Sequence, residues 1–280
     1  KKIDFSLIGQ MEKYNHLINQ KVIIMKNLLN TKYYENISST YPLSCQVYED
    51  LKQNGFMFIS SNNFQKLFCE KKALNHSNIA FFCESWNNLD TDNFMSDNGT
   101  YRKRKHATFN IKDRICNKND YIPHYQTVDY NILNGGIERY FTEIDEIIDN
   151  PIFKELLSFA YNIFDRTNSR NWFVEAHQFR IESNNNMAGK PTPEGIHRDG
   201  VDFVLMALVK RQNMIGGVTT IYDLQKNQLS SFELDQFLDV ALVNDHQVFH
   251  GVSEIIPFDS NNESLSFRDV LVITFKEIKQ

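Results

Sequence analysis

The chain has 280 residues, of which 41% are hydrophobic and 23% charged, and its net charge is −5. This length and composition allow a substantial core and are typical of a soluble globular protein. The negative charge argues against a general binder of nucleic acid or of anionic membranes. No apolar run is long enough to span a membrane, and the first residues lack the apolar core of a signal peptide, although the missing initiator Met leaves a removed leader open.

The four cysteines are scattered along the chain and form no CxxC pair. Free thiols in a reducing compartment are therefore favoured over disulfides. We expect a cytoplasmic protein without a disulfide framework.

The first half of the chain is predicted to be rich in helices. Apolar residues recur every three or four positions over residues 11–29, which is typical of an amphipathic helix. Glycine and polar boundaries predict further helices and one short strand. These are helices over residues 47–53, 64–74, 137–148 and 152–164, the last beginning after a possible cap at Asp149-Asn150, and a strand over residues 56–59.

Residues 101–111 are predicted to be extended, after a turn-rich loop over residues 90–99. Arg102, Arg104 and His106 then share one face of a strand. A solvated edge strand would explain this charge run. This is the favoured explanation. The alternative is a strand of which one or two arginines reach into a pocket to hold a carboxylate.

From Trp172 onward the pattern changes to short strands separated by turns. This spacing suits an all-β barrel or sandwich rather than βαβ units. The strands are expected over residues 172–181, 203–209, 218–222, 240–243, 246–249 and 268–275. We predict a protein of the α+β or mainly β class with one domain, 1–280, in which a helix-rich part, 1–165, buttresses a jelly-roll core, 166–280, of the cupin-like double-stranded β-helix type.

A possible metal site lies in the run from Glu194 to Gly200. His197 and Asp199 are two positions apart, so they point to the same side of an extended backbone. His250 follows further along the chain, and Arg268 opens the last apolar strand. Two His and one carboxylate are the ligands of non-heme Fe(II) oxygenases, and an Arg offers a bidentate fork for a dicarboxylate. If residues 246–250 are extended, His246 shares a face with His250, so periodicity does not choose between them.

The run Pro-Thr-Pro-Glu-Gly-Ile-His-Arg-Asp-Gly-Val-Asp-Phe over residues 191–203 resembles a bacterial family of iron- and 2-oxoglutarate-dependent dioxygenases. This family includes the hydroxylases of free amino acids, such as L-isoleucine 4-hydroxylase. The similarity continues in residues 101–106, 175–181, 216–219, 250–253 and the strand from Arg268, and so covers roughly residues 95–280. Glu254 departs from the pattern, because relatives tend to carry Pro there.

The resemblance implies that His197, Asp199 and His250 bind Fe(II), with His250 preferred to His246 because it precedes Gly-Val-Ser. It also implies that Arg268 binds the distal carboxylate of 2-oxoglutarate, and Thr219 is a plausible hydroxyl partner for that group. The implied reaction is hydroxylation of an aliphatic C–H bond, coupled to oxidation of 2-oxoglutarate by O2, and ascorbate is expected to stimulate it.

The implied substrate is a free L-amino acid or a related small metabolite rather than a nucleic acid or a membrane. A zwitterion in a closed pocket needs a donor for its carboxylate and acceptors for its ammonium. The expected substrate contacts are Arg104, or failing that Arg102, for the carboxylate, with Gln178 and Arg180 as further pocket residues.

Two other classes of protein remain as alternatives. One is a jelly-roll metal enzyme that does not use 2-oxoglutarate, such as a zinc hydrolase or a manganese isomerase. The other is a non-catalytic ligand-binding module. Arg268 argues against the first, because a hydrolase needs no dicarboxylate anchor. The intact triad argues against the second, because folding does not require these three polar residues together. The substrate, the oxidised carbon, the choice between hydroxylation and desaturation, and the oligomeric state stay open. The role of roughly the first 90 residues beyond structural support also stays open.

Overall fold

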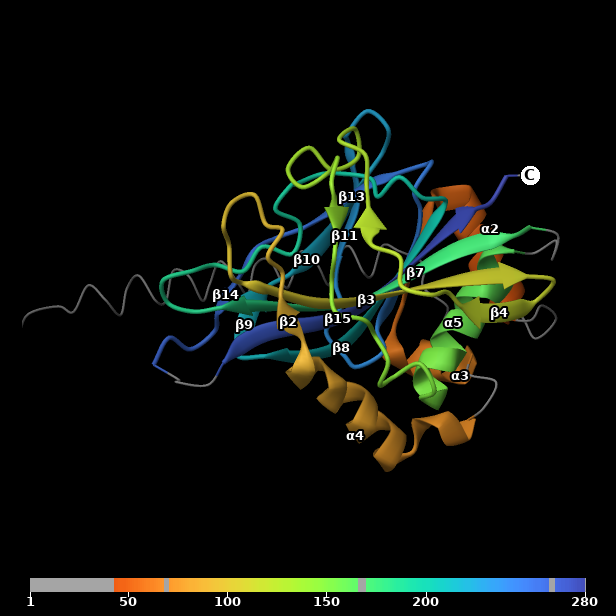
Figure 1. Ribbon diagram of the computed structural model, residues 1–280, viewed down its shortest axis with the longest axis horizontal. Helices are drawn as coiled ribbons and strands as arrows, with labels where there is room; N and C mark the ends of the chain where they lie inside the picture. The colour runs from red at the N-terminus through yellow and green to blue at the C-terminus, as the bar shows by residue number, and fades with distance from the viewer. Residues whose placement is uncertain (1–42, 68–70, 166–169, 262–264, 280) are drawn as a thin grey trace, which may run out of the picture.

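The computed structural model describes residues 43–67, 71–165, 170–261 and 265–279 (Figure 1). The helix predicted over residues 11–29 lies outside the described residues. Within them the protein is mainly β, with antiparallel sheets and few helices. No helix of the described part is long and apolar enough to cross a membrane.

The largest unit is an eight-stranded sheet. Its long strands β8, β15, β7 and β3 run side by side across the centre of Figure 1. In spatial order its strands are β1 (Phe56–Ile59), β12 (Val240–Asn244), β8 (Phe203–Gln212), β15 (Ser266–Glu277), β7 (Trp172–Ser183), β3 (Arg102–Lys112) and β2 (Asp90–Thr91), with β4 (Ile115–Lys118) also paired to β3.

A smaller, three-stranded sheet packs against one face of the large sheet. Its strands are β11 (Gln228–Glu233), β10 (Val218–Tyr222) and β13 (Phe249–Val252). Ile221 and Phe232 of this sheet share a hydrophobic cluster with Val204 and Met206 of the large one. Two short strand pairs complete the β structure: β9 (Met214–Gly216) with β14 (Ile255–Pro257), and β5 (His124–Tyr125) with β6 (Glu138–Arg139).

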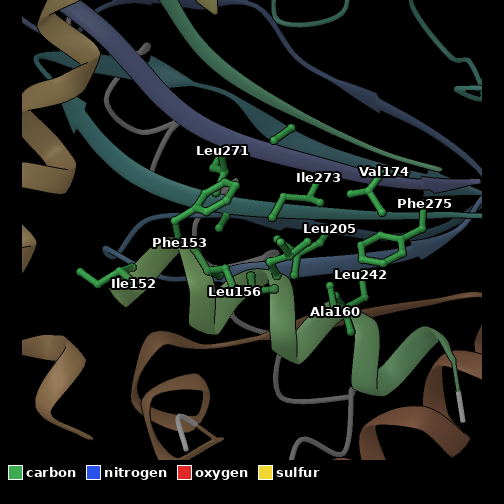
Figure 2. Close-up of a cluster of buried hydrophobic side chains, with 14 of the residues drawn as sticks. Ile152, Phe153, Leu156, Ala160, Val174, Leu205, Leu242, Leu271, Ile273 and Phe275 are labelled. Atoms are coloured by element: carbon green, nitrogen blue, oxygen red, sulfur yellow. The ribbon is translucent and has the colours of Figure 1, made fainter. Parts of the chain in front are cut away.

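Helices cover the other face of the large sheet. They are α2 (Leu43–Asn54), α3 (Ser61–Leu67), η1 (Lys71–Leu74), α4 (His76–Glu84), η2 (Ser85–Asn88) and α5 (Pro151–Phe164). The helix α5 begins at Pro151, and the Asn150 side chain caps it by accepting a hydrogen bond from the amide of Ile152. Figure 2 shows Leu271 and Ile273 of β15 in the same buried cluster as the apolar side of α5.

Alternation along β15 gives this strand two different faces. Its odd-numbered residues face the helices, whereas Val270 and Val272 face the opposite side, because successive strand side chains point to opposite faces. Both faces are buried. One forms the main hydrophobic core, and the other forms the wall of a cavity.

Residues 137–148 do not form the predicted helix. Phe141, Ile144 and Ile147 are buried at a spacing of three, which imitates the buried stripe of a helix. The backbone instead pairs with β3: the amide of His106 donates to the carbonyl of Thr142, and the amide of Ile144 donates to the carbonyl of His106. Tertiary pairing therefore overrides the local pattern.

Three other expectations also need correction. Within the stretch 64–74, expected to be one α-helix, the described residues form an α-helix up to Leu67 and a 3₁₀ turn, not an α-helix, at Lys71–Leu74. The strand expected at 246–249 starts only at Phe249, because the amide of Gln247 donates to the carbonyl of Asn244 and closes a turn. The strand β3 is not a solvated edge. It lies between β7 and the short strands β2 and β4, and most of its side chains are buried.

Candidate active site in a polar cavity

A cavity of about 420 Å³ opens between the large sheet, the three-stranded sheet and the connection that contains β5 and β6. The strand register explains which side chains line it. Arg268, Val270 and Val272 of β15 lie opposite Ile181, Phe179 and His177 of β7, and all six face the cavity. The volume is in the range of small-molecule sites.

His197, Asp199 and His250 meet at one end of this cavity. His197 and His250 are joined by a β-bridge, in which each backbone amide donates to the other residue's carbonyl. The Nε2 atoms of both imidazoles lie 3.5 Å from the oxygens of Asp199. Two donors at about 2.1 Å from one cation are about 3 Å apart when adjacent, so these separations suit a shared metal ion.

The electrostatics of the three residues also fit a cation. Burial opposes protonation of His197, but the hydrogen bond to Asp199 and the charges of Asp199 and Glu194 outweigh it and raise the pKa of His197 to about 9. Burial lowers the pKa of His250 to about 4, so this imidazole is neutral. The nitrogen Nδ1 of His197 lies 3.0 Å from the carbonyl of Gly195, which leaves Nε2 for a metal. A divalent cation and a proton compete for that lone pair.

The sequence did not reveal Asp245, which holds the metal-ligand loop in place. Its buried carboxylate accepts hydrogen bonds from the backbone amides of Asp199, Gly200 and Val201 at 2.8–3.3 Å. Burial and the neighbouring charge of Asp199 raise the pKa of Asp245 to about 6. Asp245 therefore positions a ligand without touching the metal site itself.

Arg268 lines the same cavity and is buried, with 4% of its surface exposed. Its Nε and Nη2 atoms have no hydrogen-bond partner among the described residues, and none of their carboxylates forms a salt bridge with it. Burial lowers the pKa of Arg268 to about 10, so the side chain remains charged at neutral pH. A buried and uncompensated guanidinium is a site for an anion.

Thr219 and Gly217 lie on the neighbouring three-stranded sheet and the turn before it. Thr219 is fully buried, and its hydroxyl has no partner among the described residues, but it does not line the cavity. Its contact with the co-substrate therefore stays a prediction. Gly217 has a φ of +72°, and a Cβ there would lie 3.2 Å from Cδ of Arg268. Glycine at this position lets the backbone pack closely against the Arg268 side chain.

Arg102 and Arg104 line the far end of the cavity from β3. Arg102 forms an ion pair with the buried Asp92 at 2.7 Å, and Arg104 lies 3.7 Å from the same carboxylate. The guanidinium of Arg104 also stacks on the rings of Phe141 and Phe179, at 3.9 and 4.5 Å from their centroids. Arg104 therefore lies in the cavity wall, as expected, but its charge already has partners.

A cluster of imidazoles adjoins Arg104. Glu175 lies 3.0 Å from Nε2 of His106 and 2.9 Å from Nδ1 of His124, and Arg104 donates to Nδ1 of His177 at 2.9 Å. The three histidines of this cluster and Glu175 lie within metal-ligand distance of one another. Because a guanidinium already occupies one imidazole nitrogen, we do not assign a second metal ion here.

Gln178 and Arg180 do not line the cavity, in contrast to the prediction for them. Gln178 donates to the hydroxyl of Ser85, and Arg180 forms a buried pair with Asp269 at 2.7 Å. Both are even-numbered residues of β7 and point toward the helices, whereas Glu175 and other odd-numbered residues point into the cavity. His246 is also outside the cavity. It is exposed, and its Nε2 lies 2.6 Å from Asp202.

The polar residues that line the cavity without having been predicted include Arg139, Gln126 and Glu194. Arg139, on β6, is buried, and it donates to the side-chain oxygen of Gln126 at 2.7 Å. Gln126 in turn donates to the backbone carbonyl of Asp199 at 3.2 Å. Glu194 has one oxygen 3.4 Å from Nε2 of His197, and its other oxygen is without a partner in the described part of the chain.

Comparison with known proteins agrees with this geometry. The chain matches the family model described as 2OG-Fe dioxygenase over residues 83–274, more than half of its length. The solved structure of a bsmA homolog from Methylobium petroleophilum PM1 is 31% identical, covers 86% of this chain and 96% of its own, and has a TM-score of 0.74.

Two more distant structures share the fold. IDO from Bacillus thuringiensis is 19% identical, with 88% of this chain and 100% of that chain covered and a TM-score of 0.71. The Fe(II)/α-ketoglutarate-dependent dioxygenase TqaL is also 19% identical, with coverage of 85% and 88% and a TM-score of 0.68. None of the curated protein sequences matches this chain.

The fold and the site thus define a non-heme iron oxygenase of the jelly-roll type. More particularly, the chain belongs to the 2OG-Fe dioxygenase family and is a 2-oxoglutarate-dependent dioxygenase, with Fe(II), 2-oxoglutarate and O2 as the reactants that the family requires. A zinc hydrolase, a manganese isomerase and a non-catalytic module are therefore not supported.

Proposed function

We propose that this enzyme hydroxylates an aliphatic C–H bond of a free L-amino acid. The observation that carries the proposal is the composition of the cavity wall beyond the metal triad. Its lining carries positively charged side chains, Arg102, Arg104 and Arg139, and two carboxylates, Glu175 and Glu194, whose side chains are each only 12% exposed. Such a wall suits a small zwitterion, because both of its charges can be paired on transfer from water.

The remaining assignments follow the geometry at the metal end. His197, Asp199 and His250 would hold Fe(II), and Arg268 would pair with the distal carboxylate of 2-oxoglutarate. When bound, Fe(II) with 2-oxoglutarate and O2 supplies an oxidant strong enough for an unactivated C–H bond. The chain itself contributes the orientation of the substrate and the exclusion of bulk water. Arg104 lies in the wall and remains a candidate contact for the substrate carboxylate.

The size of the cavity supports a small substrate. A volume of about 420 Å³ must hold both 2-oxoglutarate and the substrate, which leaves room for a molecule about as large as 2-oxoglutarate itself. A folded peptide or a nucleic-acid strand would need a longer groove.

The test is a survey of substrates. The enzyme is incubated with Fe(II), ascorbate, 2-oxoglutarate and each of the common L-amino acids, and both succinate and a product heavier by one oxygen atom are measured by mass spectrometry. We expect one or a few aliphatic amino acids to stimulate succinate formation and to yield the oxygenated product in equal amount. Stimulation only by larger metabolites would refute the substrate class and leave the iron chemistry unchanged.

A further inference from the structure

Two buried arginines of the cavity have no carboxylate partner among the described residues: Arg268 and Arg139. Arg102 and Arg104 differ from them, because both lie within 4 Å of Asp92. If Arg268 meets the carboxylate of the co-substrate, Arg139 is left as the charged donor without an anion. Its one hydrogen-bond partner in the described part is the neutral side chain of Gln126, and its Nε has none.

Glu194 is the matching group of opposite sign. Asp92 and Glu175 each have cationic or imidazole donors, and Asp199 is a metal ligand. Among the described residues, Glu194 forms an ion pair within 4 Å with His197 alone, at 3.4 Å, and the Nε2 atom of His197 has no proton to donate once it binds a metal. The second oxygen of Glu194 is buried without a partner among the described residues.

We propose that Arg139 and Glu194 recognise the two charged groups of the amino-acid substrate, Arg139 binding the α-carboxylate and Glu194 binding the α-ammonium. This inference rests on the proposed function and names the residues that set its specificity. An unpaired buried charge is costly, so a ligand that pairs both charges at once gains affinity from each.

The positions of the two residues fit a ligand whose charges are attached to one carbon. Both line the same cavity, and both are linked to the metal loop, Arg139 through Gln126 to Asp199 and Glu194 through His197. No ion pair joins these two side chains, so each is open to the opposite charge of a ligand in the cavity that they share. Burial and the charge of Arg102 lower the pKa of Arg139 to about 10, and the charges of Asp92, Glu194 and Glu175 oppose this shift, so Glu194 acts on Arg139 across the cavity.

The test measures selectivity rather than affinity alone. Binding is followed by calorimetry under anaerobic conditions, with the enzyme loaded with Fe(II) and 2-oxoglutarate. The probes are L-isoleucine, L-leucine and L-valine, each as the free amino acid, as its methyl ester and as the acid without the amino group. For wild-type enzyme we expect esterification of the carboxylate, or removal of the amino group, to weaken binding at least ten-fold.

The variants should then separate the two contacts. The preference for the amino group is the affinity for the amino acid divided by that for the acid without the amino group, and the preference for the free carboxylate is the affinity for the amino acid divided by that for its methyl ester. In Glu194→Gln the first ratio should fall towards one, while the second persists. In Arg139→Gln the preference for the free carboxylate should fall towards one, while the preference for the amino group persists. Each preference is a ratio within one variant, so a general loss of affinity, or of metal, cancels. Should Arg139→Gln fold poorly, Glu194→Gln still tests half of the pair independently.

Four outcomes would overturn the inference. Variants that change both preferences equally, or neither, would show a structural role. Loss of the carboxylate preference in Arg104→Gln but not in Arg139→Gln would assign the carboxylate to Arg104. If wild-type enzyme binds the amino acids, their methyl esters and the acids without the amino group equally well, the inference is refuted and the proposed function is left intact. If it binds no amino acid at all, the substrate class is refuted as well.

Discussion

Substitution of Arg268 should separate co-substrate binding from folding. A pKa of about 10, against 12.5 for a free side chain, means that the fold disfavours the charged guanidinium by about 3 kcal/mol. The sign follows from the lowered value: the charged form is less stable in the folded state than in the unfolded state at any pH below about 10. Replacing Arg268 by Leu removes this cost, although it also removes favourable packing against Gly217.

The same substitution removes the partner of 2-oxoglutarate. Two charge-assisted hydrogen bonds contribute about 1.5–3 kcal/mol each, so losing them should weaken binding of 2-oxoglutarate by about 100-fold or more. Arg268→Lys keeps the charge but not the planar fork, so its affinity for 2-oxoglutarate should lie between those of the wild type and Arg268→Leu. We therefore expect Arg268→Leu to melt at or above the temperature of the wild type without ligand, and to gain almost no stability from added 2-oxoglutarate.

The assay is thermal unfolding with and without 2-oxoglutarate, together with calorimetric titration of the co-substrate. Arg211→Leu is the matched control, because Arg211 lies opposite Arg268 in the strand register but pairs with Glu233 and does not line the cavity. Wild-type affinity for 2-oxoglutarate in Arg268→Leu would refute the assignment. A strong loss of stability without ligand would show instead that Arg268 has a structural role.

Four shorter predictions follow from the site and its surroundings. His250→Ala should lose bound iron, measured as metal per chain, whereas His246→Ala should keep it, and the reverse result would reassign the distal ligand. Asp245→Ala should weaken metal affinity about 10–100-fold in a competition titration, and Asp245→Asn less so; no change in Ala would remove its positioning role. Arg180→Met should lower the free energy of unfolding by about 3–5 kcal/mol, because a buried carboxylate is left unpaired, yet it should not change substrate preference; a changed preference would return Arg180 to the substrate site. Burial lowers the pKa of His124 from 6.5 to about 4, so its contribution to stability is present above pH 6.5 and is lost as the pH falls towards 4, by up to about 3 kcal/mol. Denaturant titrations of His124→Gln across this range should show a shallower dependence than wild type, and an unchanged slope would contradict this account.

The three residues that meet in the candidate metal site could be predicted as a group, because the chemistry demands particular residue types in a fixed relation. A His and an Asp two positions apart, a later His and an Arg on the last strand left few alternatives once taken together. The choice of His250 over His246 was not accessible from periodicity. It depended on the Gly-Val-Ser sequence after His250, and the structure brings His250, not His246, to Asp199.

The substrate wall was harder to predict, for a physical reason. Strand alternation divides β7 into two faces, but both are buried, one by helices and one by the cavity. The sequence therefore could not show that Glu175 and His177, rather than Gln178 and Arg180, face the substrate. Gln126 and Asp245 give no local signal at all, because each reaches the loop of Asp199 through hydrogen bonds to backbone groups that are distant in sequence. Glu194 lies within the recognised run, so its charge next to His197 was the one available clue.

The wall that contains Arg139 suggests how this enzyme could be redesigned. The metal triad and Arg268 lie on or beside the strands of the two sheets, whereas Gln126 and Arg139 belong to the connection between β4 and α5. Replacing this connection with that of a relative should alter which molecules are oxidised and leave the iron chemistry in place. The graft must retain an amide equivalent to Gln126, because that side chain links the wall to the backbone of Asp199.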